Sequence, residues 1–341
     1  MIVTPFDPAT ATAAELSGYA AVAIAASAAD RPGDPAPTTE SVTALLRAVR
    51  PPVIRMSYWA ARDGDRIAGT GLLVLMDDEN AAVAVVDITV HPGFRRRGLG
   101  TALLRELAAV SAAAGRTVVM LQTVIEGGAG QAWAGAHGFA VAQRSARLVV
   151  AMPVADQSAW PPDAAAGYRL ARWAGAVPDD YLASYATAKT AMQDAPMGQM
   201  SARAPAMTPQ LLREIEASLR ASGRDLLIVA AIAARSAEVA GLTEIVLGKA
   251  RPDVALQRDT VVLSGHRGHG LGLAMKAANL RWVAADYPAV RQVRTSTAVD
   301  NEHMLRVNRQ LGFAVDQITQ TCELSLADLT ARLAAVPGAS R

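Results

Sequence analysis

The chain has 341 residues, which is enough for two domains of ordinary size, about 100 to 200 residues each. Half of the residues are hydrophobic (51%), yet no uninterrupted apolar run approaches the roughly 18 residues that a membrane-spanning helix needs. A net charge of +2 with scattered basic residues argues against a nucleic-acid partner, and the single cysteine, Cys322, excludes an intramolecular disulfide. We therefore expect a two-domain protein that binds neither nucleic acid nor a membrane.

The first half opens with two predicted helices and a hairpin. Residues 1–16 lack a basic region followed by an apolar one, so we expect no secretory signal and a cytoplasmic location. Helical patterns occur at residues 11–29 and 39–50, and an Asp-Gly turn then joins the strands of a hairpin at residues 53–76. Such alternation of element types indicates α/β layering, in which helices cover a mixed sheet.

Two segments rich in glycine and arginine mark an internal repeat. Residues 95–100 read RRRGLG and residues 267–272 read RGHGLG, so their first arginines are 172 positions apart (267 minus 95). Each segment follows an apolar, β-branched run opened by an aspartate, Asp87 or Asp259, and leads into an alanine- and leucine-rich helical pattern. The chain is therefore expected to contain two copies of one strand–loop–helix unit.

The elements after the loop also occur twice. In each half a second β-type run, a helical stretch, a Gly-Phe pair and a final strand follow in the same order, with the pairs at residues 138–139 and 312–313. Residues 154–166 contain a Trp-Pro-Pro-Asp sequence and no clear periodicity, which is typical of a connector. They are predicted to link a first domain, residues 1–153, to a second domain, residues 167–341.

The glycine-rich turn has the chemistry of an anion site. A strand that ends in such a turn and opens a helix presents unpaired backbone N–H groups and the positive end of the helix dipole. Neither half has the Gly-Lys-Ser/Thr triplet of a P-loop, and neither fits the glycine spacing of a dinucleotide fingerprint. The expected ligand is a pyrophosphate on the backbone, with the adjacent arginine adding charge-assisted hydrogen bonds.

Both loops match the signature Q/R-x-x-G-x-G/A of the GNAT superfamily of N-acetyltransferases. The chain resembles this superfamily over nearly its whole length, once in each half. Residues 90–94 (VHPGF) resemble the family's lead-in to the loop, and residues 301–313 (NEHMLRVNRQLGF) resemble its late helix. The resemblance implies an α/β chain of two tandem GNAT folds, each a mixed, mostly antiparallel sheet with splayed central parallel strands and flanking helices. It also implies acetyl-CoA, or another acyl-CoA, as the acyl donor.

In this family the acyl-CoA pantetheine pairs with the strand before the loop, and the pyrophosphate sits on the loop amides. Carried over by position, the resemblance implies cofactor-binding residues in both halves and in the late helix of the second. They are Ile88, Thr89, Val90, Arg95, Arg96, Arg97, Gly98, Leu99, Gly100 and Thr101; Thr260, Val261, Val262, Arg267, Gly268, His269, Gly270, Leu271 and Gly272; and Asn301 and Asn308. His266 and His269 are expected to be loop residues, with no metal bound.

The resemblance implies direct attack of an amine on the thioester, with a carboxylate base before the loop and a tyrosine acid in the late helix. Asp87 and Asp259 are the candidate bases, and the alternative for each is a structural carboxylate near a strand end. The tyrosine is absent, because its position holds Ala134 in the first half and Asn308 in the second. Asn308 is therefore a candidate to hydrogen-bond the CoA sulfur or a water molecule.

The leading hypothesis is an enzyme that transfers an acetyl group from acetyl-CoA to a primary amine of a small molecule or peptide. A longer acyl-CoA or a different nucleophile is open, as is a non-catalytic acyl-CoA-binding role for one or both halves, which the missing tyrosines favour. The second half is expected to be the catalytic one, because it combines Asp259 with the more complete late segment. The expected assembly is a monomer or a homodimer.

Overall fold

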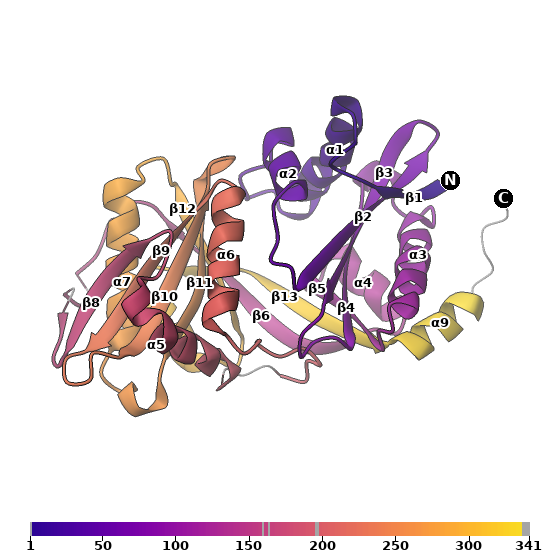
Figure 1. Ribbon diagram of the computed structural model, residues 1–341. Coiled ribbons are helices and arrows are strands. Elements are labelled where there is room, and N and C mark those ends of the chain that lie inside the picture. Colours follow the sequence, from indigo (N-terminus) through magenta and orange to yellow (C-terminus); the bar gives the residue numbers. More distant parts are fainter. Residues whose placement is uncertain (1, 159, 163, 195–197, 336–341) are drawn as a thin grey trace.

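The elements of the protein follow one order twice. The computed structural model describes residues 2–158, 160–162, 164–194 and 198–335 (Figure 1). In the first half the elements are β1 (Ile2–Phe6), α1 (Ala13–Asp30), α2 (Thr39–Leu46), β2 (Ile54–Asp63), β3 (Arg66–Met76), β4 (Val83–Val90), η1 (Pro92–Phe94), α3 (Leu99–Ala113), β5 (Val118–Ile125), α4 (Ala129–Ala136) and β6 (Ala140–Ala151). In the second half they are β7 (Ala164–Ala165), β8 (Tyr168–Ala174), α5 (Asp179–Thr190), η2 (Ala191–Asp194), α6 (Pro209–Ala221), β9 (Arg224–Ala233), β10 (Val239–Gly248), β11 (Arg251–Val262), η3 (Ser264–His266), α7 (Leu271–Asp286), β12 (Gln292–Ala298), α8 (Glu302–Gln310), β13 (Ala314–Ser325) and α9 (Leu326–Ala335). The predicted order is confirmed, whereas β1, β7 and α9 have no counterpart in the sequence prediction; β7 lies within the predicted connector, residues 154–166.

Equivalent parallel strands carry the two aspartates. β4 and β5 are parallel and joined through α3, and β11 and β12 are parallel and joined through α7. Asp87 on β4 and Asp259 on β11 therefore occupy corresponding strands, as the repeat predicts. Helices α1 and α2 pack on one face of the first-half sheet and α3, α4 and α9 on the other, while α5 and α6 lie opposite α7 in the second half (Figure 1). The predicted mixed α/β architecture is confirmed.

The two halves exchange their last strands. All strands of the described chain join one sheet in the order β1-β2-β3-β4-β5-β13-β6-β12-β11-β10-β9-β8-β7, so β13 lies between β5 and β6, and β6 lies between β13 and β12. Side chains follow this exchange: Leu148 and Val150 of β6 pack into the second-half core, whereas Cys322 of β13 and Leu329 of α9 pack into the first-half core. Each core is therefore completed by residues from the other half of the sequence.

Because strands of both halves belong to one continuous sheet, the sheet marks no domain boundary at the predicted linker, residues 154–166. Residues 159 and 163 of the segment 154–166 lie outside the described residues, and the division of the chain into domains stays a prediction. Among the described residues, no helix has both the length and the apolar character that crossing a bilayer requires.

Local capping accounts for where several helices begin. The hydroxyl of Thr12 accepts a hydrogen bond from the N–H of Glu15, whose carboxylate accepts one from the N–H of Thr12, and this capping box starts α1. Helix α6 begins at Pro209 behind Thr208, whose hydroxyl accepts from a first-turn N–H. Each such cap typically stabilises a helix by about 1 kcal/mol.

A charged cluster joins the halves on the face that carries α1 and α2. Arg147 of β6 donates hydrogen bonds to Asp34 in the α1–α2 loop (2.8 and 3.0 Å) and to Asp316 of β13 (2.8 and 2.5 Å). Arg294 of β12 lies 3.3 Å from the same Asp34 carboxylate. The α1–α2 loop of the first half is therefore tied to central strands from both halves.

We predict that Leu148→Ala destabilises the second half, although Leu148 belongs to the first half in sequence. Leu148 is fully buried in the second-half core, and a Leu→Ala cavity lowers the free energy of unfolding by about 2–5 kcal/mol. Chemical denaturation measures the loss, and hydrogen exchange locates it, with faster exchange expected at β12 amides.

Leu73→Ala is the matched control, because Leu73 on β3 is fully buried in the first-half core. That variant should speed exchange at the neighbouring strand β4. An increase confined to β4 and β5 in Leu148→Ala would contradict the exchanged arrangement.

Candidate acyl-CoA sites

Each half contains an opening where its two parallel strands separate. The pairing of β4 with β5 ends at Val86 and Leu121, and the pairing of β11 with β12 ends at Leu256 and Arg294. Beyond these points β4 stays paired only with β3, and β11 only with β10. The predicted pantetheine contacts, Ile88 to Val90 and Thr260 to Val262, lie on these diverging strand ends, where one backbone edge is free to pair with a ligand.

Both glycine-rich loops begin a helix at a left-handed glycine. Gly98 has a φ of +83° and precedes α3, and Gly270 has a φ of +71° and precedes α7, in each case without a side-chain cap. Two residues earlier φ is also positive, at Arg96 (+65°) and at Gly268 (+83°). The first N–H groups of α3 and α7 are therefore available to an anion at the positive end of the helix dipole.

The signature arginines shape the loops. Each donates from Nε to the main-chain carbonyl five residues earlier, at 3.2 Å in both halves. Arg95 also pairs with Asp30 at the end of α1 (2.6 Å), and Arg267 pairs with Asp194 after α5 (3.1 Å). Both guanidinium groups thus tie the strand end to a helical segment earlier in the chain, and the first N–H groups of α3 and α7 have no side-chain cap. A direct contact between these arginines and the cofactor stays a prediction.

The space beside the loops differs between the halves. A Cβ atom added to Gly100 would lie 3.3 Å from Nε1 of Trp133 on α4, and the Thr101 hydroxyl lies 3.1 Å from Nε2 of His137. At Gly272, the corresponding glycine, nothing lies within 4 Å of the added atom. Helix α4 therefore packs against the start of α3 in the first half, whereas the second-half loop is open at the same point.

The loop histidines of the second half contact an aromatic side chain. Nδ1 of His266 lies 2.9 Å from the Tyr168 hydroxyl, and the rings of His269 and Tyr168 are 5.6 Å apart. Nδ1 of His269 also lies 3.1 Å from the carbonyl oxygen of Arg267. Within the described residues no three side chains of the metal-binding types gather at one place.

Asp87 lies in the first-half opening without a cationic partner within ion-pair distance among the described residues. Its carboxylate accepts a long hydrogen bond (3.4 Å) from the Thr89 hydroxyl. The carboxyl is reached by solvent but surrounded by protein atoms, and this desolvation raises its pKa, against smaller opposing effects of Thr89 and Arg31. Burial and the charge of Asp87 together raise the pKa of Tyr19 on α1. A carboxylate with a raised pKa and no ion pair is suited to accept a proton.

Asp259, in contrast, belongs to a buried ion-pair network. The ammonium group of Lys189 on α5 lies 2.9 Å from Asp259 and 2.5 Å from Glu244 on β10, and the Tyr185 hydroxyl donates to Glu244 at 2.6 Å. Lys189 and Glu244 are each 4% exposed. Burial raises the pKa of Asp259, but the adjacent Lys189 outweighs this and holds the pKa below its usual value. Asp259 is therefore a weaker base than Asp87.

The two late-helix asparagines have different surroundings. Oδ1 of Asn301 accepts a hydrogen bond from the N–H of Met304 at 3.1 Å and caps α8. Asn308 is 1% exposed, and its Oδ1 has no hydrogen-bond partner among the described residues. A buried acceptor without a donor is unfavourable unless a ligand or water supplies one. The geometry thus favours Asn308 over Asn301 as a ligand contact.

Comparison with known proteins agrees with this geometry. The sequence profile of the acetyltransferase (GNAT) family matches residues 29–139, which include Asp87 and the first loop. A tandem GNAT protein from the clavulanic acid biosynthesis pathway is 27% identical and has a TM-score of 0.79, with 95% of this chain and 98% of that chain covered. The chain thus has the fold of a tandem GNAT protein, and its residues 29–139 match the family. A GCN5-related N-acetyltransferase from Sphaerobacter thermophilus shares the fold at 18% identity, with a TM-score of 0.68 over 95% of both chains. No curated protein sequence matches significantly.

The second GNAT half contains a buried lysine that the sequence analysis missed. Lys276 on α7 is 1% exposed, and its ammonium nitrogen lies 5.4 Å from the ring centre of Phe313. Burial lowers its pKa from 10.5 to about 7. In the first GNAT half the same position, nine residues after the signature arginine, holds Leu104. A position-by-position comparison of the two loop helices would have revealed this lysine at a core position.

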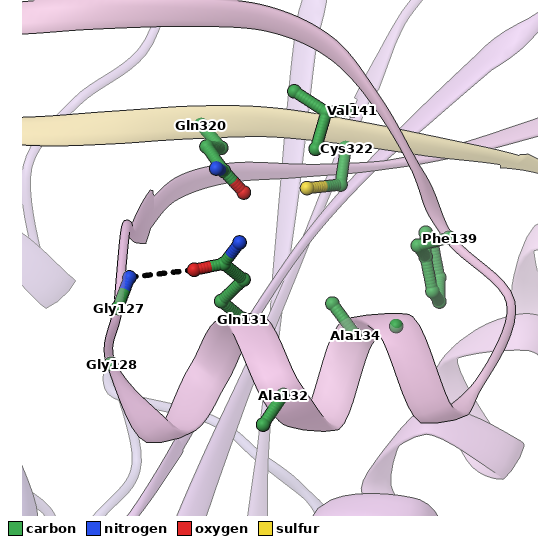
Figure 2. Close-up of a pocket in the computed structure, with 10 residues that line it drawn as sticks. Gly127, Gly128, Gln131, Ala132, Ala134, Phe139, Val141, Gln320 and Cys322 are labelled. Atoms are coloured by element: carbon green, nitrogen blue, oxygen red, sulfur yellow. Dashed lines mark hydrogen bonds between the residues drawn. The ribbon is translucent and has the colours of Figure 1, made fainter.

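A cavity of about 370 Å³ lies between α4 and the exchanged strand β13 of the GNAT pair (Figure 2). Cys322 lines it, is 2% exposed, and has a thiol pKa raised by burial, so the thiol stays protonated at neutral pH. Gln320 donates from Nε2 to Glu126 (2.9 Å), while its Oε1 has no partner in the described part of the chain. A buried, protonated thiol is a poor nucleophile, so the structure gives no support to an acyl-enzyme on the lone cysteine.

We predict that the free energy of unfolding rises with pH between about 7 and 10.5 through Lys276. Its lowered pKa means that the folded protein binds fewer protons than the unfolded chain in this window. Lys276→Met removes the effect, so from pH 7 to pH 9 the wild type should gain roughly 2 kcal/mol relative to this variant. Urea unfolding at both pH values measures the difference.

Leu104→Met makes the corresponding change in the first half, where no charge is buried. It should shift stability by less than about 1.5 kcal/mol, equally at both pH values. Identical pH dependence in wild type and Lys276→Met would show that Lys276 is charged at neutral pH in the folded protein.

Proposed function

We propose that the protein transfers an acyl group from an acyl-CoA, in the simplest case acetyl-CoA, to a primary amine of a small molecule or peptide. We further propose that the first half performs this reaction. The observation that carries the proposal is the difference between two equivalent carboxylates: among the described residues Asp87 has no ion pair, whereas Asp259 lies 2.9 Å from the ammonium group of Lys189. The GNAT family supports acyl transfer in general.

The backbone of each loop meets the needs of a CoA pyrophosphate. The free N–H groups that follow Gly98 and Gly270 are oriented by positive φ values at these glycines, and no side chain caps them. The diverging ends of β4 and β11 offer a free backbone edge to the amide groups of pantetheine. Bound acyl-CoA would supply the activated thioester. Acyl-CoA sites in both halves are therefore part of the proposal.

Asp87 is the proposed base of the transfer. An amine must lose its ammonium proton before it can attack, and a carboxylate with a raised pKa takes up this proton more readily than an ion-paired one. The new C–N bond then forms at the thioester carbonyl while the C–S bond breaks, and the CoA thiolate takes up a proton. Because Cys322 is buried and protonated, no acyl-enzyme is assigned to it.

A non-catalytic acyl-CoA-binding role is proposed for the second half. Its loop has the same left-handed glycine and more open space at Gly272 than the first half has at Gly100. The Asp259 carboxylate, however, is ion-paired with Lys189. This assignment replaces the preference for the second half that the sequence alone favours.

Asp87→Asn should lower kcat by about 10²- to 10⁴-fold, because the general base is lost. Its affinity for CoA, measured by calorimetry, should stay within about twofold of wild type, since the loop amides are untouched. Release of free CoA with a panel of amines measures turnover.

The matched variant Asp259→Asn should reduce turnover much less, because Lys189 already suppresses proton uptake at that carboxylate. A silent Asp87→Asn together with an inactive Asp259→Asn would reverse the assignment of the catalytic half. Absence of CoA release with every amine, despite CoA binding, would refute the proposed reaction.

Gly98→Val and Gly270→Val should each weaken CoA binding to their own half by about 5- to 150-fold. A β-branched residue at positive φ is strained by about 1–3 kcal/mol, and the loop relieves the strain by turning its N–H groups away. Calorimetry should resolve two sites in the wild type and one strong site in each variant.

Gly115→Val is the control, since Gly115 also has positive φ (+71°) but lies at the far end of α3. It should destabilise the protein without changing CoA affinity. Wild-type protein that binds no CoA would remove the basis for both loop assignments.

A further inference from the structure

The cavity between α4 and β13 lies apart from both CoA openings (Figure 2). Its walls come from the turn before α4, from α4, from the residues that lead into β6 and from β13. None of the described residues that line it belongs to β4, β11 or a glycine-rich loop. Its volume of about 370 Å³ is within the range of small-molecule sites, roughly 300–1,000 Å³. The exchanged strand therefore closes a cavity that is large enough for a ligand of its own.

Buried side chains form the floor of this cavity, and exposed residues form its rim. Ala134, Phe139 and Cys322 are buried, whereas Val141 at the start of β6 is 45% exposed. Gly127, in the turn before α4, is also exposed. A ligand can therefore enter from solvent and bury an apolar part against the floor. A largely apolar wall with a few placed polar groups is typical of small-molecule sites.

Two glutamine amides supply the polar groups. Nε2 of Gln320 donates to Glu126 (2.9 Å), and Oε1 of Gln131 accepts from the N–H of Gly127 (2.6 Å). Hydrogen bonds from Arg144 and Gln320 lower the pKa of Glu126 to about 2, so this carboxylate is ionised and can only accept. Because a backbone N–H can only donate, both partners fix the orientation of their amide. Gln320 thus presents an acceptor to the cavity, and Gln131 presents a donor (Figure 2).

The acceptor of Gln320 is unsatisfied in the described part of the chain. Gln320 is 4% exposed, and its Oε1 atom has no hydrogen-bond partner there, so it does not receive the Nε2 group of Gln131. A buried acceptor without a donor is unfavourable, and a ligand N–H or O–H in the cavity would supply one. This atom is the second observation, beside the cavity itself, that indicates a ligand.

The pairing of one acceptor with one donor selects the chemistry of the ligand. A primary amide carries an N–H donor for Gln320 and a carbonyl acceptor for Gln131. A carboxylate has no donor for Gln320 and would approach the ionised Glu126. An ammonium group has no acceptor for Gln131. A neutral amide is therefore the group that meets both requirements.

We propose that the cavity between α4 and β13 binds a neutral, mostly apolar molecule through a primary amide, whose N–H donates to Gln320 and whose carbonyl accepts from Gln131. The apolar part of the ligand packs against Phe139, Cys322 and Val141. Neither Asp87 nor a glycine-rich loop takes part, so the site does not depend on acyl transfer.

A pair of isosteric probes tests the hydrogen bond to Gln320. Benzamide and acetophenone share a phenyl ring and a carbonyl, but acetophenone has a methyl group in place of the amide nitrogen. Ligand-detected NMR measures the affinity of each for protein saturated with CoA, so that the CoA openings are filled. Benzamide should bind the wild type about 3- to 10-fold more tightly, since only it supplies the missing donor.

Gln320→Leu removes the acceptor and should make the two affinities equal. Gln131→Leu should instead weaken both probes alike, because both carry the carbonyl. Thr321→Val is the matched control: Thr321 alternates with Gln320 along β13 and faces the other side of the sheet, so the preference for benzamide should persist. No binding of benzamide to the wild type, equal affinities of the two probes, or a preference that survives in Gln320→Leu would overturn the amide site.

A variant that fills the cavity locates the bound probe. Gly135 lines the cavity, and a Cβ atom added there meets no heavy atom within 4 Å. Because leucine favours a helix more than glycine does, Gly135→Leu should fold and should weaken benzamide binding at least about tenfold. Ala136→Leu, at the exposed next position of α4, is the control and should bind like wild type. Unchanged benzamide binding in Gly135→Leu would show that the probe binds elsewhere and would overturn the proposal.

Discussion

Antiparallel pairing of β6 with β13 at the centre of the sheet holds the two halves of this protein in one body. Without the partner's strand, each half would end in an unpaired edge at β5 or β12, and its core would lack the side chains that the exchanged strand contributes. The two openings therefore keep a fixed relation to each other. Because of this relation, residues of one half, such as Val49, contact residues of the other, such as Ser218.

The two halves share the backbone geometry of the site but differ in the buried ionisable residues around it. The loop glycines have similar φ values, and the two aspartates stand on equivalent strands. Yet Lys189 lies beside Asp259, and nothing comparable lies beside Asp87 within the described residues. One lysine on a neighbouring helix thus reverses the direction of the aspartate pKa shift, and with it the capacity of the half to accept a proton. Lys276, at the position of Leu104, adds a second buried lysine to the same half.

Features that depend on contiguous residues could be predicted from the sequence. Short motifs that occur once in each half predict the loops, the helices that begin there and the strand positions of Asp87 and Asp259. The strand exchange could not be predicted, because the alternating pattern of β6 is satisfied by any neighbouring strand and says nothing of which one it joins. The ion-pair partners of Arg95 and Asp259 could not be predicted for a related reason. Asp30 and Lys189 lie on helices that are far away in sequence, and only the fold brings them close. Asn301 was predicted to bind the cofactor, a role that stays untested beside its observed one as a helix cap.

The proton affinities of the two aspartates test the account most directly, because they require no knowledge of the acceptor. Carboxyl ¹³C NMR titration measures both pKa values, with the resonances assigned from Asp87→Asn and Asp259→Asn. The account predicts a pKa above the usual aspartate value of 3.8 for Asp87 and below it for Asp259. The reverse order, or two values that coincide, would contradict the claim that the first half holds the catalytic base.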